Sequence, residues 1–116
     1  MRAAKGVALL SVSRFPLVRA YRPQLWGKVV PELDRAAAAI ADQQRGTVSA
    51  SETVRISDRQ ARRYDVAYER DGKKLIERLG FVLRGKTEYL LLCRYESGGD
   101  TGACDRLLRS FTLAAA

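Results

Sequence analysis

The hydrophobic pattern changes its period at Gly46, and this change restricts the fold more than any other feature of the sequence. From about residue 24 to Gly46, apolar residues recur every three or four positions, which is typical of one face of a helix. After it, apolar and polar residues alternate, which is typical of strands with one buried face. The chain has 116 residues, enough for one domain with a core and too few for two. We therefore expect one α+β domain spanning residues 1–116.

The first half predicts a strand followed by a long helix. Residues 6–15 have the pattern of a strand, and an irregular basic and aromatic stretch follows Pro16. A helix is predicted over 24–44, because its apolar residues form one stripe: Leu25, Val29, Leu33, Ala36, Ala37 and Ile40. Pro31 is expected to kink this helix or to mark its true start. Gly46 is expected to end it in a left-handed conformation.

The second half predicts an antiparallel meander over 46–95. Asp71-Gly72 is a favoured two-residue hairpin turn. A tight turn there sets five cross-strand pairs: Tyr68 with Leu75, Val66 with Glu77, Tyr64 with Leu79, Asp65 with Arg78 and Glu69 with Lys74. A second turn at Gly85-Lys86 sets three more: Phe81 with Leu90, Leu79 with Leu92 and Glu77 with Arg94.

The last strand of the meander is apolar on both sides, so both of its faces need a cover. The long helix can cover only one face. A short helix predicted over 101–110 is the candidate for the other, because it carries an apolar stripe formed by Ala103 or Cys104, Leu107, Leu108 and Phe111. The expected architecture is a mainly antiparallel sheet with helices on both faces.

The chain contains two cysteines, Cys93 and Cys104, and their placement favours a disulfide. Cys93 ends the central strand, and Cys104 opens the helix expected to cover that strand. The bond would close a loop of about 12 residues, would contribute roughly 3 kcal/mol, and implies an oxidising compartment. The alternative is two free thiols buried as small apolar groups. There is no C-x-x-C motif for thiol catalysis.

Nothing in the sequence points to catalysis. The chain has no histidine, the side chain most often used as a general base near neutral pH. No glycine-rich phosphate loop, nucleophile elbow or metal-spaced cluster is present. Asp65 and Glu69 share a strand face, but each has a basic partner across the hairpin. We expect no enzyme, no cofactor and no metal. No apolar run approaches the roughly 20 residues of a membrane span, so we also expect no transmembrane segment.

Positive charge is concentrated at the start of the chain. The net charge is +8, and residues 1–31 contain six basic residues and no acidic one. A candidate partner-binding surface follows, in which basic and aromatic side chains alternate: Arg14, Arg19, Tyr21, Arg22, Trp26 and Lys28. Such a surface suits anionic ligands that also stack. The alternative is an ordinary solvated surface in which Trp26 belongs to the core.

Five segments carry a resemblance to a known family: RFPL at 14–17, ELDRAA at 32–37, ARRYDVAYERDGK at 61–73, FVLRGKTEYLLLCR at 81–94 and ACDRLLRSFTL at 103–113. With the order of elements, they make the chain resemble the PsbP-like α/β/α sandwich. That family includes an extrinsic subunit of photosystem II and a nuclear import factor that binds the GTPase Ran. Within that family, the chain looks like small actinobacterial members, which are often lipoproteins or secreted. These are fold motifs without a catalytic residue.

The resemblance implies a non-catalytic binding or scaffold domain of the bacterial cell envelope, with a protein or anionic ligand as partner. One alternative is a basic protein that binds nucleic acid through residues 14–28, and another is a small-ligand-binding domain. The relatives usually begin with an exported leader and a first strand that ends in a Pro-Gly-Trp-like turn, and we expect neither within residues 1–116. Either Met1 lies inside the gene, or the domain lacks this edge strand. A domain lacking this edge strand has an open sheet edge that allows homodimers. The expected location is extracellular or the cell envelope, or the cytoplasm if Met1 is the genuine start.

Overall fold

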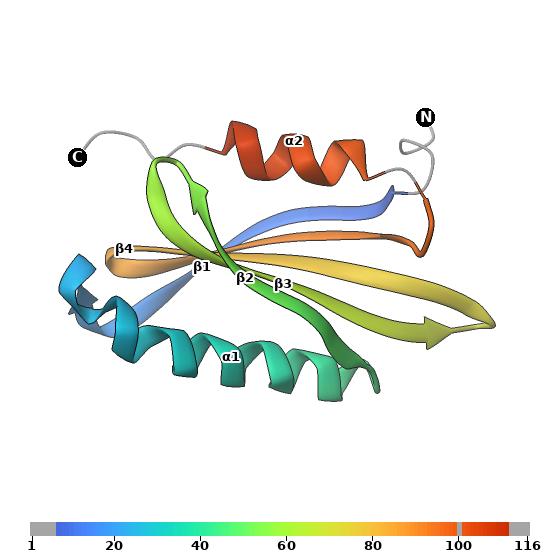
Figure 1. Ribbon diagram of the computed structural model, residues 1–116, viewed down its shortest axis with the longest axis horizontal. Helices are drawn as coiled ribbons and strands as arrows, with labels where there is room; N and C mark the ends of the chain where they lie inside the picture. The colour runs from blue at the N-terminus through green and yellow to red at the C-terminus, as the bar shows by residue number, and fades with distance from the viewer. Residues whose placement is uncertain (1–6, 100, 112–116) are drawn as a thin grey trace.

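The computed structural model describes residues 7–99 and 101–111, with residues 7–10 described through their backbone alone. A four-stranded antiparallel sheet of order β1-β4-β3-β2 lies between two helices, one on each face (Figure 1). The predicted α+β architecture is therefore confirmed. The elements are β1 (Val7–Tyr21), η1 (Pro23–Leu25), α1 (Trp26–Gln43), β2 (Thr47–Ile56), β3 (Arg59–Arg70), β4 (Lys73–Glu96) and α2 (Gly102–Ser110).

β4 turns back on itself near Gly85, so that its first half pairs with β3 and its second half with β1 (Figure 1). A straight strand of this length would span about 79 Å, whereas the longest axis of the molecule is 42 Å. The backbone N–H of Ser97 donates to the carbonyl of Lys74 at 2.9 Å, and Arg94 Nη2 lies 2.8 Å from Glu77 Oε2. Both contacts fit the register predicted from a turn at Gly85.

Two-residue turns, whose residues have a left-handed backbone conformation, connect β2 to β3 and β3 to β4. Asp71 and Gly72 have φ angles of 53° and 78°, as a type I′ hairpin requires, and the five predicted pairs between β3 and β4 are confirmed. Ser57 and Asp58 make the corresponding turn between β2 and β3, with φ angles of 52° and 59°. The sequence did not predict this turn, because neither residue is glycine.

β1 is longer than the predicted strand over 6–15 and includes much of the stretch predicted to be irregular. Pro16 pairs with Thr87, but the next pair is Tyr21 with Gly85. Five steps along β1 therefore correspond to two along β4, and residues 17–20 bulge out of the sheet edge. We call this segment the β1 protrusion. Pro16 is tolerated because β1 is an edge strand, where a missing backbone N–H interrupts no further pairing.

α1 ends differently from the prediction. The left-handed residue is Arg45, with a φ angle of 59°, and not Gly46. The N–H of Gly46 donates to the carbonyl of Ala41 at 2.8 Å, and that of Arg45 to Asp42 at 3.0 Å, as in a Schellman motif. Gly46 is needed for space, because a Cβ there would lie 2.7 Å from the Cβ of Tyr68. Pro31 lies inside the helix and does not mark its start.

Each helix covers its own apolar cluster. On one face α1 packs over β3 and β4, with a buried core formed by Leu33, Ala37, Ala41, Tyr64, Val66, Tyr68, Leu79, Phe81 and Leu83. On the other face α2 covers two smaller clusters, one around Cys93, Tyr95 and Cys104 and one formed by Ile56, Ala61, Val82 and Leu91. The predicted cover for the second face is thereby confirmed.

Candidate functional site

The six residues proposed from the sequence lie along one path, from β1 through η1 into the first turn of α1. They are Arg14, Arg19, Tyr21, Arg22, Trp26 and Lys28. All four cations are exposed. Within the part of the chain that the structure describes, none of these cations takes part in an ion pair. This segment therefore presents positive charge that the fold itself does not neutralise.

An open hollow of about 460 Å³ brings two of these cations together. It is lined by Arg19 and Ala20 from the end of β1, by Arg22, and by Gln24 and Leu25 of η1. A lining of two arginines with the apolar residues Ala20 and Leu25 suits a phosphate or carboxylate attached to an apolar group. Arg14 and Lys28 lie outside this hollow.

The two aromatic residues of the predicted site pack against the core. Tyr21 and Trp26 are both partly buried against the cluster under α1. Burial raises the pKa of the Tyr21 hydroxyl, while the positive charge of Arg59 on β3 lowers it. Arg59 is thus close enough to add its charge to this end of the sheet. The sequence could not predict this, because the two residues are 38 positions apart.

Sequence reasoning missed the apolar component of this surface. Three of the four exposed large apolar side chains in the described part of the chain belong to β1: Val12, Phe15 and Val18. Val18, at 97% exposure, is in the β1 protrusion beside Arg19. Lys86 lies in the adjoining turn of β4, since its neighbour Gly85 pairs with Tyr21. One signal in the sequence was Pro16, which makes a regular continuation of the strand unfavourable.

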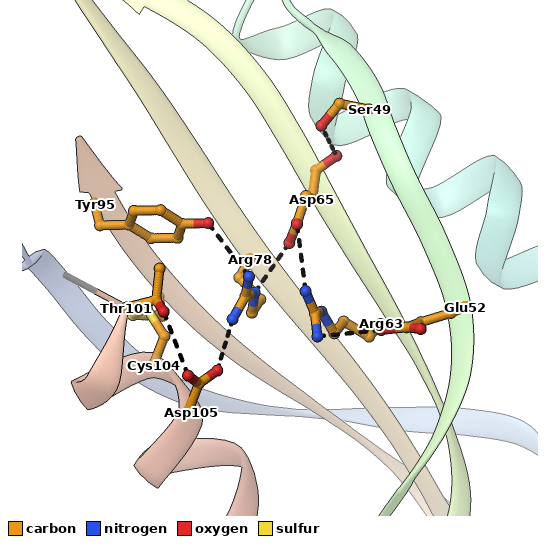
Figure 2. A network of polar contacts seen from close by, with 10 residues as sticks. Ser49, Glu52, Arg63, Asp65, Arg78, Tyr95, Thr101, Cys104 and Asp105 are labelled. Carbon is orange, nitrogen blue, oxygen red and sulfur yellow. Dashed lines mark hydrogen bonds and ion pairs between the residues drawn. A yellow bond between two sulfur atoms is a disulfide. The ribbon is translucent and has the colours of Figure 1, made fainter. Parts of the chain in front are cut away.

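A second polar group, centred on Arg78, lies beneath α2 (Figure 2). Its guanidinium donates to Asp65 Oδ1 at 3.0 Å, to Asp105 Oδ1 at 2.8 Å and to Tyr95 Oη at 3.3 Å. Burial lowers the pKa of Arg78, but the hydrogen bond and charge of Asp65, aided by the charges of Tyr95 and Asp105, raise it above its ordinary value. Arg63 also binds Asp65. Because Arg78 is occupied, this group fixes structure and has no free acid or base.

Two further groups tie α1 to the sheet. Glu77, only 1% exposed, accepts hydrogen bonds from Arg94, from Gln44 just beyond α1, and from Tyr68. Asp34 on α1 accepts a hydrogen bond from Tyr64 at 2.5 Å. Burial and the bond to Asp34 raise the pKa of Tyr64 to about 12. Every buried side-chain nitrogen or oxygen within the described residues has a partner, so these groups stabilise the fold.

The predicted cysteine pair is present as a disulfide between Cys93 on β4 and Cys104 on α2, with Cα atoms 5.6 Å apart. The disulfide lies under α2 and inside the buried cluster, so its role is structural. Among residues 7–99 and 101–111, no group of three or more acidic, cysteine or histidine side chains is arranged to hold a metal. Neither described helix is long and apolar enough to cross a membrane.

Comparison with known proteins finds no match of this chain to a family model, to a curated protein or to a solved structure.

Proposed function

We propose that the chain is a non-catalytic binding domain of an oxidising compartment, at the bacterial cell envelope or outside the cell, and that its partner is anionic. One observation supports the anionic partner above all: the cations at positions 14, 19, 22 and 28 are exposed and outside every described ion pair. Cations on the sheet faces, such as Arg78 and Arg94, are held by carboxylates. Exposed charge of one sign attracts a partner of the other.

The oxidising compartment is supported by the pairing of Cys93 with Cys104, because structural disulfides persist mainly in secreted and envelope proteins. The relationship to the PsbP-like family, and with it the scaffold role, rests on the sequence motifs alone. A thiol titration in denaturant, on protein purified without reductant, tests the compartment. No free thiol is expected, and two free thiols would contradict it.

The anionic partner is tested with a fluorescently labelled polyglutamate peptide as a probe of defined chemistry. We expect binding that weakens as salt is added, because exposed charges are screened. The double variant Arg19→Ala/Arg22→Ala should bind about 5- to 10-fold more weakly, as expected for two exposed charge contacts. The control is Lys73→Ala/Lys74→Ala, which removes the same net charge at the opposite end of the sheet (Figure 1), where Lys73 is paired with Glu96.

Two outcomes would contradict the proposal. One is the absence of binding to polyglutamate and to other polyanions at low salt. The other is an equal loss of binding in the lysine control, which would show that net charge alone is responsible.

A further inference from the structure

We propose that the β1 protrusion docks the domain on the surface of an anionic phospholipid bilayer. Val18 enters the layer of lipid headgroups, and Arg19 and Arg22 bind lipid phosphates. This inference rests on the proposed function, because such a bilayer is one particular anionic partner. The inference adds the chemical identity of the partner, and it names Val18 as the residue that distinguishes a bilayer from other anions.

The β1 protrusion exposes one apolar side chain, Val18, between residues that are anchored in the core. Leu17 and Tyr21, at the two ends of the bulge, pack against the core cluster under α1. Between them Val18 is 97% exposed, the highest exposure among the large apolar side chains of the described chain. A fully exposed valine between anchored neighbours gains nothing for the fold. It can gain free energy only when another apolar surface covers it.

The charges around Val18 match a layer of phosphates. Arg19 follows it directly in the chain, and Arg22 shares the hollow of about 460 Å³ with Arg19. In Figure 1 this end of β1, η1 and the turn of β4 that carries Lys86 lie at the same end of the sheet. Each basic residue near an anionic bilayer surface adds to the attraction, and Arg binds phosphate with paired N–H groups. Apolar insertion and basic flanks together are typical of binding at the membrane surface.

A bilayer fits these observations better than an added protein strand. A peptide strand needs a regular row of backbone groups along the sheet edge. Here Pro16 has no N–H to offer, and the register shift between Pro16 and Tyr21 removes the regular spacing. The edge is therefore interrupted where the charge is concentrated.

A bilayer also fits better than a nucleic acid. Tyr21 and Trp26 are packed against the core, which limits their use as platforms for bases. A phosphate backbone offers no apolar layer that could receive Val18. The lipid headgroup region provides both the phosphates and the apolar boundary beneath them.

The test is co-sedimentation of the whole chain with vesicles of phosphatidylglycerol mixed with phosphatidylcholine, and with vesicles of phosphatidylcholine alone. We expect binding to the anionic vesicles only. Val18→Ser should weaken it about fivefold to tenfold, because the inserted apolar surface is lost. The control Val48→Ser, at a partly exposed valine on the opposite edge strand β2, should leave binding unchanged. Both variants should keep the melting temperature of the native chain.

Other outcomes separate this inference from the proposed function. Binding to polyglutamate without binding to anionic vesicles would overturn the bilayer and keep an acidic partner. Vesicle binding that Val18→Ser does not weaken would overturn the insertion. Tighter binding to a single-stranded oligonucleotide than to vesicles, lost in Arg19→Ala/Arg22→Ala, would replace the bilayer by nucleic acid. No binding to any of these probes would overturn both proposals.

Discussion

The two faces of the sheet are covered by helices of different length, and the balance of apolar and polar contacts differs between the two helices. α1 has 18 residues and places three of them fully in an apolar core with β3 and β4. α2 has nine residues, of which one, Cys104, is buried. This short helix is fixed by the covalent bond to Cys93 and by the ion pair of Asp105 with Arg78.

The difference shows how helix length determines the kind of anchor that is needed. A helix shorter than about 12 residues is marginal by itself in water, and its small apolar face buries little surface. Besides its small apolar clusters, α2 therefore depends on two contacts that do not need a large buried area, the disulfide and the ion pair. The face under α1 should be sensitive to the loss of apolar volume, and the face under α2 to the loss of charge pairing and to reduction.

The largest expected effect comes from replacing Glu77 or Arg78, two charged neighbours on β4 that lie on opposite faces of the sheet. Arg78→Met should lower the free energy of unfolding by about 3–5 kcal/mol, because it leaves Asp65 buried with one cation fewer and releases Asp105. Glu77→Met should cost only about 1–3 kcal/mol, since Arg94 is 23% exposed and can reach water. Denaturant unfolding measures both. Equal losses in the two variants would contradict the proposed difference between the faces.

Removal of the disulfide should have the next largest effect. Cys93→Ala/Cys104→Ala should lower the free energy of unfolding by about 3 kcal/mol on the loop-entropy model. Hydrogen exchange then shows where the loss occurs. We expect faster exchange in residues 102–110, because α2 loses its covalent anchor, and unchanged protection in α1. If both helices lost protection together, α2 would not be an independently held element.

Gly80 tests how closely α2 approaches the sheet. A Cβ at this position would lie 2.9 Å from Leu108 Cδ2 and 3.2 Å from Ile56 Cδ1. Gly80→Ala should therefore cost about 1–3 kcal/mol through overpacking. Leu108→Ala should relieve part of this cost, so that the double variant is less destabilised than the sum of the two single variants. Strict additivity would show that α2 shifts away freely.

Gly46, the corresponding glycine near α1, should tolerate an added side chain less well than Gly80 does. At Gly46 an added Cβ would meet the backbone carbonyl of Ala67, and a backbone cannot move aside as the end of a leucine side chain can. Gly46→Ala should therefore be more destabilising than Gly80→Ala in the same unfolding measurement. The reverse order would indicate that the connection from α1 to β2 is adaptable.

The sequence predicted those parts of the fold that depend on local rules. Asp71-Gly72 sets the register of β3 against β4, and Gly85 sets the reversal of β4, because these turns leave little choice of pairing. The disulfide followed from the same register, which places Cys93 on the face under α2. The alternation of apolar and polar residues alone would not have determined the register of the strands or the pairing of the cysteines.

The parts that could not be predicted depend on contacts between distant segments. The extension of β1 beyond Pro16 requires the pairing of Tyr21 with Gly85, 64 residues later. The exposure of Val18 follows from that pairing, and Pro16 signals locally only that the regular strand is interrupted. At the end of α1, Arg45 takes the left-handed conformation, and Gly46 leaves space for Tyr68, which passes close by. The charge of the candidate site could therefore be predicted from the sequence, but its shape could not.

The smallest expected effect concerns Glu88, which lies on β4 opposite Phe15. Burial raises its pKa, and the charge of Glu32 on α1 raises it further. The native state therefore holds this proton more tightly than the unfolded chain. The resulting stability is present below the ordinary pKa of glutamate, about 4.3, and is lost as the pH rises through the raised pKa. At neutral pH the ionised Glu88 thus weakens the face under α1.

Glu88→Gln should accordingly raise the melting temperature at neutral pH, by the small amount typical of substitutions outside the core, about 0.5 kcal/mol or less. The gain should shrink at about pH 4, where the native carboxyl is already protonated. In a Glu32→Gln background the gain should also be smaller, because the second cause of the shift is removed. A gain that is independent of pH would show that Glu88 acts through packing rather than charge. The face under α1, held largely by apolar area, would then tolerate a half-buried carboxylate without electrostatic cost, whereas Arg78 on the other face requires its carboxylates.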